Sequence, residues 1–225
     1  MDDRKELTTL LAQLGPERIR RSVYDNNNQL LAEGIADERD GHPDDFSSID
    51  FSGKSVVDLG CNFGFYSFLA RQKGANHVVG VDLDDLVIQG CKLLQNINNI
   101  TGVEFICSDF TAPSFSQLFD ITLLIDFFGK GSIIKGIDRY LDAIESITRE
   151  VMIVSARNYY RIEKHFNGYL DTIIGLYSSD YVRNGKFYLI EYISEYFKEN
   201  WELTILSPDD HDISSKKTLY FHKAK

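Results

Sequence analysis

The first fifty residues show one clear helical pattern. Leucines recur at positions 7, 10, 11 and 14, the spacing of one helix face, and Gly15-Pro16 follows them. This spacing predicts a helix over residues 2–14 that ends at the glycine. Residues 16–50 are polar and contain several Asn, Gly and Pro residues, which favours short helical turns followed by a loop. We therefore expect residues 1–50 to form an N-terminal helical cap or lid.

From residue 51 onward, short apolar runs alternate with helical patterns. Aliphatic and β-branched runs predict buried strands at residues 55–59, 77–81, 103–107, 120–125 and 151–154. Helical spacing of apolar residues predicts helices at residues 65–73, 84–98 and 132–148. Alternation of this kind favours a parallel sheet that is covered by helices on both faces.

The C-terminal end of the chain breaks this alternation. Apolar runs at residues 201–206 and 218–221 are separated by a polar loop without a helix, which requires an antiparallel pairing. The predicted fold class is α/β: a doubly wound, mostly parallel seven-stranded sheet with helices on both faces and a C-terminal antiparallel hairpin. Residues 51–225 are expected to form one domain, with an aromatic insertion at about 157–198 that could form a lid over a pocket.

A glycine-containing turn joins the first predicted strand of this domain to the first predicted helix, in the sequence VDLGCNFGFY at residues 57–66. Glycine permits a positive φ and a close approach of a ligand to the backbone. A dinucleotide turn G-x-G-x-x-G, aligned on Gly60, requires glycine at position 62 and a small residue at position 65. The chain has Asn62 and Phe65 there. The turn therefore disfavours NAD and a dehydrogenase.

The stretch VVDLGCNFGFYSFLA, residues 56–70, resembles motif I of the class I, Rossmann-like S-adenosylmethionine-dependent methyltransferases, whose usual form is (D/E)-x-G-x-G-x-G. Asn62 stands where that motif commonly has glycine, and asparagine tolerates left-handed backbone conformations better than most residues. The resemblance covers about residues 52–225, including the final hairpin. It implies S-adenosyl-L-methionine as the cofactor and S-adenosyl-L-homocysteine as the product.

The resemblance also implies roles for aspartates that follow successive strands. Asp58 would orient the turn and the amino group of the methionine part, and Asp82 would accept from the two ribose hydroxyls, since a carboxylate is acceptor-only. Asp109 would accept from the adenine amino group, and Asp126 would face the methyl end. The expected cofactor-binding residues are Asp58, Gly60, Cys61, Asn62, Gly64, Phe65, Asp82, Leu83, Asp109, Phe110 and Asp126.

Each of these aspartates, taken alone, is more often a cap of a turn or helix than a ligand-binding residue. Asp84, for example, is expected only to cap the following helix. The combination carries the prediction, because ligands of open α/β sheets bind at the carboxyl ends of the strands.

The substrate side is less defined by the sequence. Methyl transfer requires positioning of the acceptor more than a dedicated catalytic side chain, so no catalytic residue is assigned; Asp126 and His165 are candidates. Phe127, Arg157, Tyr160 and His165 are candidate substrate residues from the loops after the fourth and fifth strands. His42 could close over the site from the N-terminal side. For the residues of the insertion, ordinary packing or surface exposure is an equally open interpretation.

Composition limits the partners and the compartment. The chain of 225 residues carries 34 acidic and 24 basic side chains, a formal charge of −10, which disfavours nucleic acid as a partner. No apolar run predicts a signal peptide or a membrane span. Three cysteines without a C-x-x-C spacing favour reduced thiols, a cytoplasmic location and no metal site. We therefore expect a small-molecule acceptor.

Two alternatives remain open. Methylation of RNA or protein would require a basic surface beside the cofactor pocket, for instance from Arg18, Arg20 and Arg21 together with Lys130 and Lys135. A non-catalytic S-adenosylmethionine-binding module would keep the same cofactor residues. The sequence pattern carries no signal for an oligomeric state.

Overall fold

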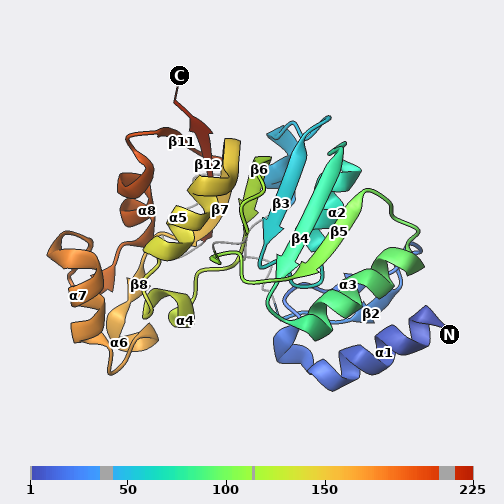
Figure 1. Cartoon of the computed structure of the whole chain (residues 1–225). Helices are drawn as coiled ribbons and strands as arrows, with labels where there is room; N and C mark the ends of the chain where they lie inside the picture. Colours follow the sequence, from blue (N-terminus) through green and yellow to red (C-terminus); the bar gives the residue numbers. More distant parts are fainter. Residues whose placement is uncertain (1, 36–42, 113–114, 208–215, 225) are drawn as a thin grey trace.

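A computed structural model describes residues 2–35, 43–112, 115–207 and 216–224 of the chain (Figure 1). Seven strands form one sheet in the order β11-β12-β7-β6-β3-β4-β5. The parallel strands are β3 (Ser55–Leu59), β4 (His77–Asp82), β5 (Val103–Cys107), β6 (Phe119–Leu124) and β7 (Thr148–Arg157). β12 (Lys216–Lys223) is antiparallel to both β7 and β11 (Trp201–Ile205). The predicted α/β fold class is confirmed.

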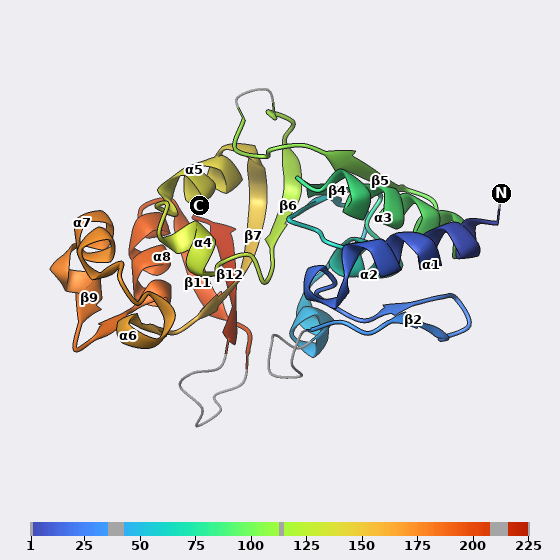
Figure 2. The same ribbon diagram turned by 90° about the horizontal axis from the view of Figure 1, so that it is seen from below.

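Alternate residues of the central strands belong to two separate cores on opposite faces of the sheet. Val56 and Val78 cluster with residues of α1 (Asp3–Leu14), α2 (Phe65–Gln72) and α3 (Asp85–Ile97). Val57 and Val79 cluster with residues of α5 (Asp138–Ile147) and α8 (Leu189–Phe197). Figures 1 and 2 show these two helical layers on either side of the strands. Burial on both faces explains why the central strands contain runs of consecutive apolar residues.

The prediction of one long helix at residues 132–148 is wrong, because this segment contains two helices. A short helix α4 (Lys130–Ile133) ends before Gly136, whose φ of 83° is left-handed, and α5 begins at Asp138. Thr148 already belongs to β7, which is longer than the predicted strand at residues 151–154. Apolar residues continue at helical spacing across the break, so the sequence pattern did not predict the break.

The segment after α1 contains strands that the sequence interpretation missed. It runs through η1 (Pro16–Arg18), β1 (Val23–Tyr24), β2 (Leu30–Ala32) and η2 (Pro43–Ser48), and β1 pairs antiparallel with β2. The buried Asp25 carboxylate accepts the N–H groups of Asn27 and Gln29, at 2.8 and 2.9 Å, and so fixes the turn of this hairpin. His42, proposed as a closing residue, lies outside the described residues.

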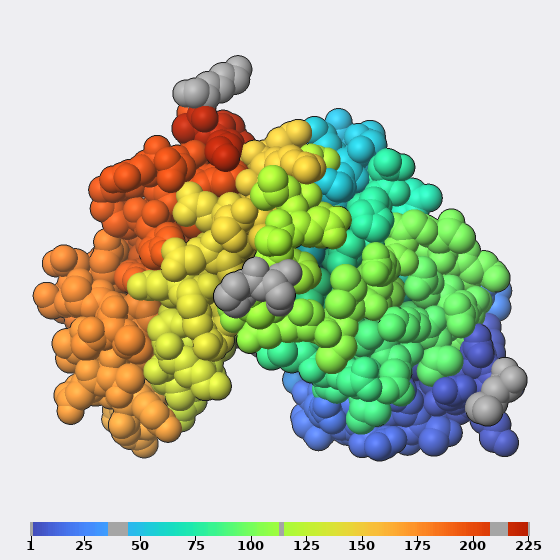
Figure 3. Space-filling view, viewed as in Figure 1, coloured from blue at the N-terminus to red at the C-terminus, as the bar shows by residue number. Residues whose placement is uncertain are grey.

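The insertion forms a small unit of its own beside the main sheet. It contains α6 (Ile162–His165), α7 (Leu170–Tyr181) and a three-stranded sheet of β8 (Tyr160–Arg161), β10 (Lys186–Phe187) and β9 (Val182–Arg183). The Tyr177 hydroxyl donates to the Ile133 carbonyl at 2.5 Å, which joins α7 to α4. In Figure 3 the lower edge of the molecule is hollowed between this orange unit and the blue-to-green N-terminal half. None of the described helices is both long and apolar enough to cross a membrane.

Candidate functional site

Two cavities adjoin at the carboxyl ends of the parallel strands. The first cavity, of about 440 Å³, extends from the glycine turn between α2 and the N-terminal hairpin, and the second, of about 420 Å³, lies between β4 and the loop after β6. Five residues line both: Arg20, Gly60, Asn62, Ile125 and Asp126. The glycine turn and the two residues after β6 therefore lie at the junction of the two cavities.

The turn between β3 and α2 has the backbone that its sequence requires. Gly60, Asn62 and Gly64 have φ values of 69°, 47° and 72°. The Gly60 N–H donates to the Val81 carbonyl at 2.8 Å, which ties the turn to the end of β4. A Cβ added at Gly60 would lie 3.1 Å from the Phe127 ring, so a side chain would fill the space beside the second cavity. The glycine keeps that space open.

Asp82 ends β4 and lines the second cavity. Its Oδ2 accepts the Asn62 N–H and its Oδ1 accepts the Asp84 N–H, both at 3.0 Å. Burial raises the pKa of this carboxyl, and the hydrogen bond from Asn62 acts against that rise. Each oxygen has further lone-pair capacity, so the carboxylate can still accept two hydroxyl donors. Asp84 caps α3 by accepting the Leu86 N–H, as predicted, but it also pairs with Arg18 and lines the second cavity, so the cap is not its only contact.

Asp58 lies at the inner end of the first cavity, with an exposed fraction of 2%. Its carboxylate accepts the Ser67 hydroxyl at 2.6 Å, across the first turns of α2. Burial raises the pKa of this carboxyl to about 6, and the Ser67 hydrogen bond only partly opposes the rise. The position provides an acidic group beside the glycine turn whose charge is costly unless a cation approaches it.

Cationic side chains from distant parts of the chain surround Asp126. The Lys216 ammonium lies 2.6 Å from its Oδ1, and the Arg21 and Arg20 guanidinium groups lie 3.4 and 3.6 Å from its Oδ2. Only 5% of the Asp126 side chain is exposed, and its backbone has a left-handed φ of 56°. The residue thus faces the junction of the cavities as one member of an ion cluster.

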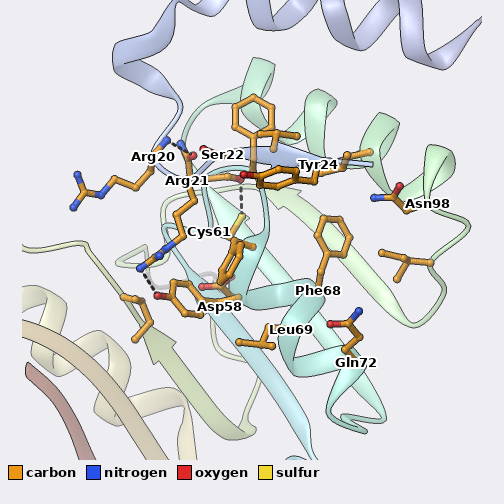
Figure 4. A pocket seen from close by; sticks show the side chains of 18 of the residues that line it. Arg20, Arg21, Ser22, Tyr24, Asp58, Cys61, Phe68, Leu69, Gln72 and Asn98 are labelled. Carbon is orange, nitrogen blue, oxygen red and sulfur yellow. Dashed lines mark hydrogen bonds between the residues drawn. The ribbon is translucent and has the colours of Figure 1, made fainter. Parts of the chain in front are cut away.

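The N-terminal segment forms the outer wall of both cavities. The Arg21 guanidinium donates to the Tyr66 hydroxyl at 2.6 Å and lies over the Phe65 ring, 5.2 Å from its centroid. Figure 4 shows Arg21 reaching past the glycine turn, with Tyr24 across the cavity from Phe68. The sequence interpretation gave Arg20 and Arg21 only a surface role and did not include Tyr24. The Asn-rich stretch between two short apolar pairs is the hairpin signal that could have located this wall.

The other expected cofactor residues fall into two groups. Cys61 and Phe65 line the first cavity, and Leu83 and Phe110 line the second. Gly64 and Asp109 line neither. A Cβ at Gly64 would lie 2.8 Å from the Phe105 ring, which indicates a packing role.

Asp109 is exposed, and its carboxylate accepts the backbone N–H and the hydroxyl of Thr111, at 2.9 and 2.7 Å. These hydrogen bonds lower its pKa. The structure therefore gives Asp109 a turn-capping contact and does not place its side chain in the second cavity.

The candidate substrate residues separate as well. Phe127 lines the second cavity, and its ring contacts the Phe110 ring at a centroid distance of 5.4 Å. Tyr160 is buried and its hydroxyl donates to the Phe128 carbonyl at 2.7 Å. Arg157 ends β7, in register with Lys216 of β12. Among the described residues, none from the insertion lines either cavity. The insertion therefore does not form the expected lid over either cavity.

His165 is likewise separate from the two cavities. It ends α6, where its Nδ1 lies 2.9 Å from the Arg161 carbonyl and its ring contacts the Tyr160 ring at 5.4 Å between centroids. The described part of the chain also contains no group of three or more His, Cys, Asp or Glu side chains that could hold a metal ion. Its three cysteines, Cys61, Cys91 and Cys107, are free thiols.

Comparison with known proteins gives one family match and several relatives. The model of a family described as a methyltransferase domain matches residues 50–220. The ribosomal protein L11 methyltransferase of Phocaeicola vulgatus is 39% identical over 71 residues, 27% of this chain and 25% of the relative. That of Alteromonas mediterranea is 38% identical over 71 residues, 29% of this chain and 24% of the relative. The chain thus spans about a quarter of the length of these curated relatives.

Solved structures show the same architecture. Magnesium protoporphyrin IX methyltransferase from Synechocystis PCC 6803, with bound SAH, superposes with a TM-score of 0.54 at 16% identity, over 78% of this chain and 76% of that one. Ribosomal protein L11 methylase from Lactobacillus delbrueckii subsp. bulgaricus gives a TM-score of 0.51 at 14% identity, over 80% and 75%. At these identities the similarity shows the fold. With the family match over most of its length, the chain belongs to the methyltransferase-domain family and has the fold of the class I S-adenosylmethionine-dependent enzymes.

Proposed function

We propose that this protein binds S-adenosyl-L-methionine in the second cavity and across its junction with the first cavity, and transfers its methyl group to a small-molecule acceptor. The observation that carries the proposal is the arrangement around Gly60. A left-handed glycine turn, the Asp82 carboxylate and the Phe110 and Phe127 rings border one cavity at the carboxyl edge of the sheet. That edge is where open α/β sheets bind their ligands.

The residues present fit this cofactor. The Asp82 oxygens each accept one backbone N–H and have capacity for two ribose hydroxyls. Leu83 is 70% exposed beside the second cavity, and together with Phe110 it offers apolar surface to an adenine ring. The buried Asp58 would receive the methionine ammonium, which offsets the cost of its own charge. Gly60 lacks the Cβ that would occupy the space toward Phe127.

The cofactor, when bound, supplies a methyl group on a sulfonium, which leaves by in-line displacement to the nucleophilic atom of the acceptor. The chain's contribution is to position the acceptor and exclude water at the junction of the cavities. Asp126 borders this junction, and its ion cluster with Lys216, Arg20 and Arg21 fixes the loop after β6. We assign no general base, because His165 lies outside both cavities.

A small acceptor is favoured because the basic residues near the cavities contact other side chains of the protein. The side chains of Arg20, Arg21 and Lys216 are only 30, 16 and 7% exposed and face Asp126. Arg18 pairs with Asp84, and Lys130 lies over the Tyr169 ring, beside the insertion. These contacts support an enclosed site rather than an extended basic surface for RNA. Protein methylation remains the second candidate, because the curated relatives named above are ribosomal protein L11 methyltransferases.

We also propose that residues 1–50 form a cap on a domain of residues 51–225, which carries the insertion at about 157–198. The packing of α1 on α3 supports the cap. The free cysteines support a reducing, cytoplasmic location.

Transfer of labelled methyl tests the acceptor class. The protein is incubated with methyl-labelled S-adenosylmethionine and with either the small-molecule or the macromolecular fraction of an extract from its own cells. We expect label to enter the small-molecule fraction. If label enters only protein, and does not do so with the Asp82→Ala variant, the small-molecule acceptor is wrong and the acceptor is a protein. No label in either fraction would support a non-catalytic module.

A further inference from the structure

The wall that closes the second cavity comes from outside the family core. Glu17, Arg18 and Arg20 line this cavity opposite Asp82, whereas the family match begins at residue 50. The backbone of this wall therefore has to be held against the glycine turn by contacts that this chain provides itself. Ile19, with an exposed fraction of 3%, fastens the segment to the core but leaves the two flanking residues directed at the cavity.

Asn62 makes those contacts. Its Oδ1 accepts the Arg20 N–H at 2.9 Å, and its Nδ2 donates to the Arg18 carbonyl at 2.8 Å. Its own N–H donates to Asp82 Oδ2 at 3.0 Å. One residue thus joins the carboxylate expected to bind ribose to the segment that faces it across the cavity. Both backbone groups flanking Ile19 are satisfied by the same amide side chain.

The backbone conformation of Asn62 would favour glycine, so the presence of a side chain there requires an explanation. Its φ of 47° is a left-handed conformation that glycine adopts without strain, and glycine is common at this position of the motif that the turn resembles. Asparagine also tolerates this conformation, but glycine would do so at a lower cost. The two hydrogen bonds to the N-terminal segment offset that cost in this chain.

We propose that Asn62 is a positioning residue that fixes residues 18–20 against the glycine turn, so that the outer wall of the cofactor cavity is in place before the cofactor binds. The inference rests on the proposed cofactor site. A wall segment that is already ordered does not have to lose conformational freedom on binding, and affinity is correspondingly higher. Without the amide, Ile19 and the ion pairs of Arg18 with Asp84 and of Arg20 with Asp126 would still hold the segment, but its backbone would lose both hydrogen bonds to the glycine turn.

The test compares Asn62→Gly with the wild type. The substitution removes both hydrogen bonds of the Asn62 side chain to the N-terminal segment. Because glycine adopts a left-handed φ without strain, we expect the variant to fold. We expect binding of S-adenosylhomocysteine to weaken about tenfold by calorimetry, the equivalent of 1.4 kcal/mol. We also expect faster hydrogen exchange of the Arg20 amide in the unliganded protein. Asn184→Gly is the matched control, since Asn184 has a φ of 52° and is exposed in the insertion; both quantities should stay at their wild-type values.

The free energy of unfolding separates positioning from a general structural role. A merely structural role predicts a loss of stability with unchanged affinity, and that result would overturn the inference. Weaker binding without faster exchange at Arg20 would also overturn it, because Asn62 would then act on the cofactor directly. If the wild type does not bind S-adenosylhomocysteine at all, the proposed function fails and this inference fails with it.

Discussion

Replacement of Asp58 by asparagine should make the unliganded protein more stable at neutral pH. The carboxyl is 2% exposed and its pKa is raised from 3.8 to about 6, chiefly by burial. Each pKa unit corresponds to 1.36 kcal/mol, so ionised Asp58 costs the folded state about 3 kcal/mol above pH 6. An asparagine carries no charge, and its amide oxygen can still accept the Ser67 hydroxyl.

The sign of the pH dependence follows from proton binding. Between pH 3.8 and about 6 the folded state binds more protons at Asp58 than the unfolded state does. The contribution of this residue to the free energy of unfolding therefore falls as pH rises through that window, and is flat on either side of it. The difference between wild type and Asp58→Asn isolates this contribution from the other carboxyls.

Urea unfolding at several values of pH between 4 and 7 measures the effect. We expect the two proteins to be similar near pH 4 and Asp58→Asn to be more stable by up to about 3 kcal/mol at pH 7. Asp25→Asn is a control with the opposite expected effect. Hydrogen bonds, chiefly the one from the Gln29 N–H, lower the pKa of Asp25, so its charged form stabilises the fold. The Asp25→Asn variant should therefore lose stability at pH 7. Parallel pH curves for wild type and Asp58→Asn, with the variant no more stable at pH 7, would refute the reasoning.

Further predictions concern the cofactor carboxylate and the turn. Asp82→Ala should weaken S-adenosylhomocysteine binding by about tenfold or more in calorimetry, because hydrogen bonds to a charged group contribute about 1.5–3 kcal/mol each; an unchanged affinity would remove Asp82 from the site. Gly64→Ala should lower the free energy of unfolding by about 1–3 kcal/mol, since φ is 72° and the new Cβ would lie 2.8 Å from the Phe105 ring. Gly53→Ala, with a φ of 71° and open space around its Cβ, should cost less, and equal losses would contradict the packing argument.

Much of the main sheet could be predicted because its signals are local. Central strands such as β3 and β4 each contain consecutive buried valines, and the glycine turn follows β3 directly in the sequence. The break at Gly136 was missed because apolar residues on both sides keep helical spacing. The N-terminal hairpin was missed because β1 and β2 contain only two and three residues, too few to show an alternating pattern.

The same distinction applies to the site. Gly60, Asn62, Asp82 and Phe127 lie together because strand ends meet at one edge of a parallel sheet, which strand order alone predicts. The ion cluster at Asp126 could not be predicted, because Lys216 lies 90 residues away in the chain and reaches Asp126 only through the antiparallel pairing of β12. Asp109 was placed in the site by analogy, whereas its local contact with Thr111 determines where its side chain points.

The central claim is that the cavity around Gly60 and Asp82 is a site for S-adenosylmethionine. Thermal unfolding with S-adenosylhomocysteine and, separately, with NAD tests it most directly. A ligand at one hundred times its dissociation constant stabilises the folded state by about 2.7 kcal/mol, a shift that is easily measured. We predict such a shift with S-adenosylhomocysteine, its reduction in Asp82→Ala, and none with NAD. Stabilisation by NAD and none by S-adenosylhomocysteine would contradict the account.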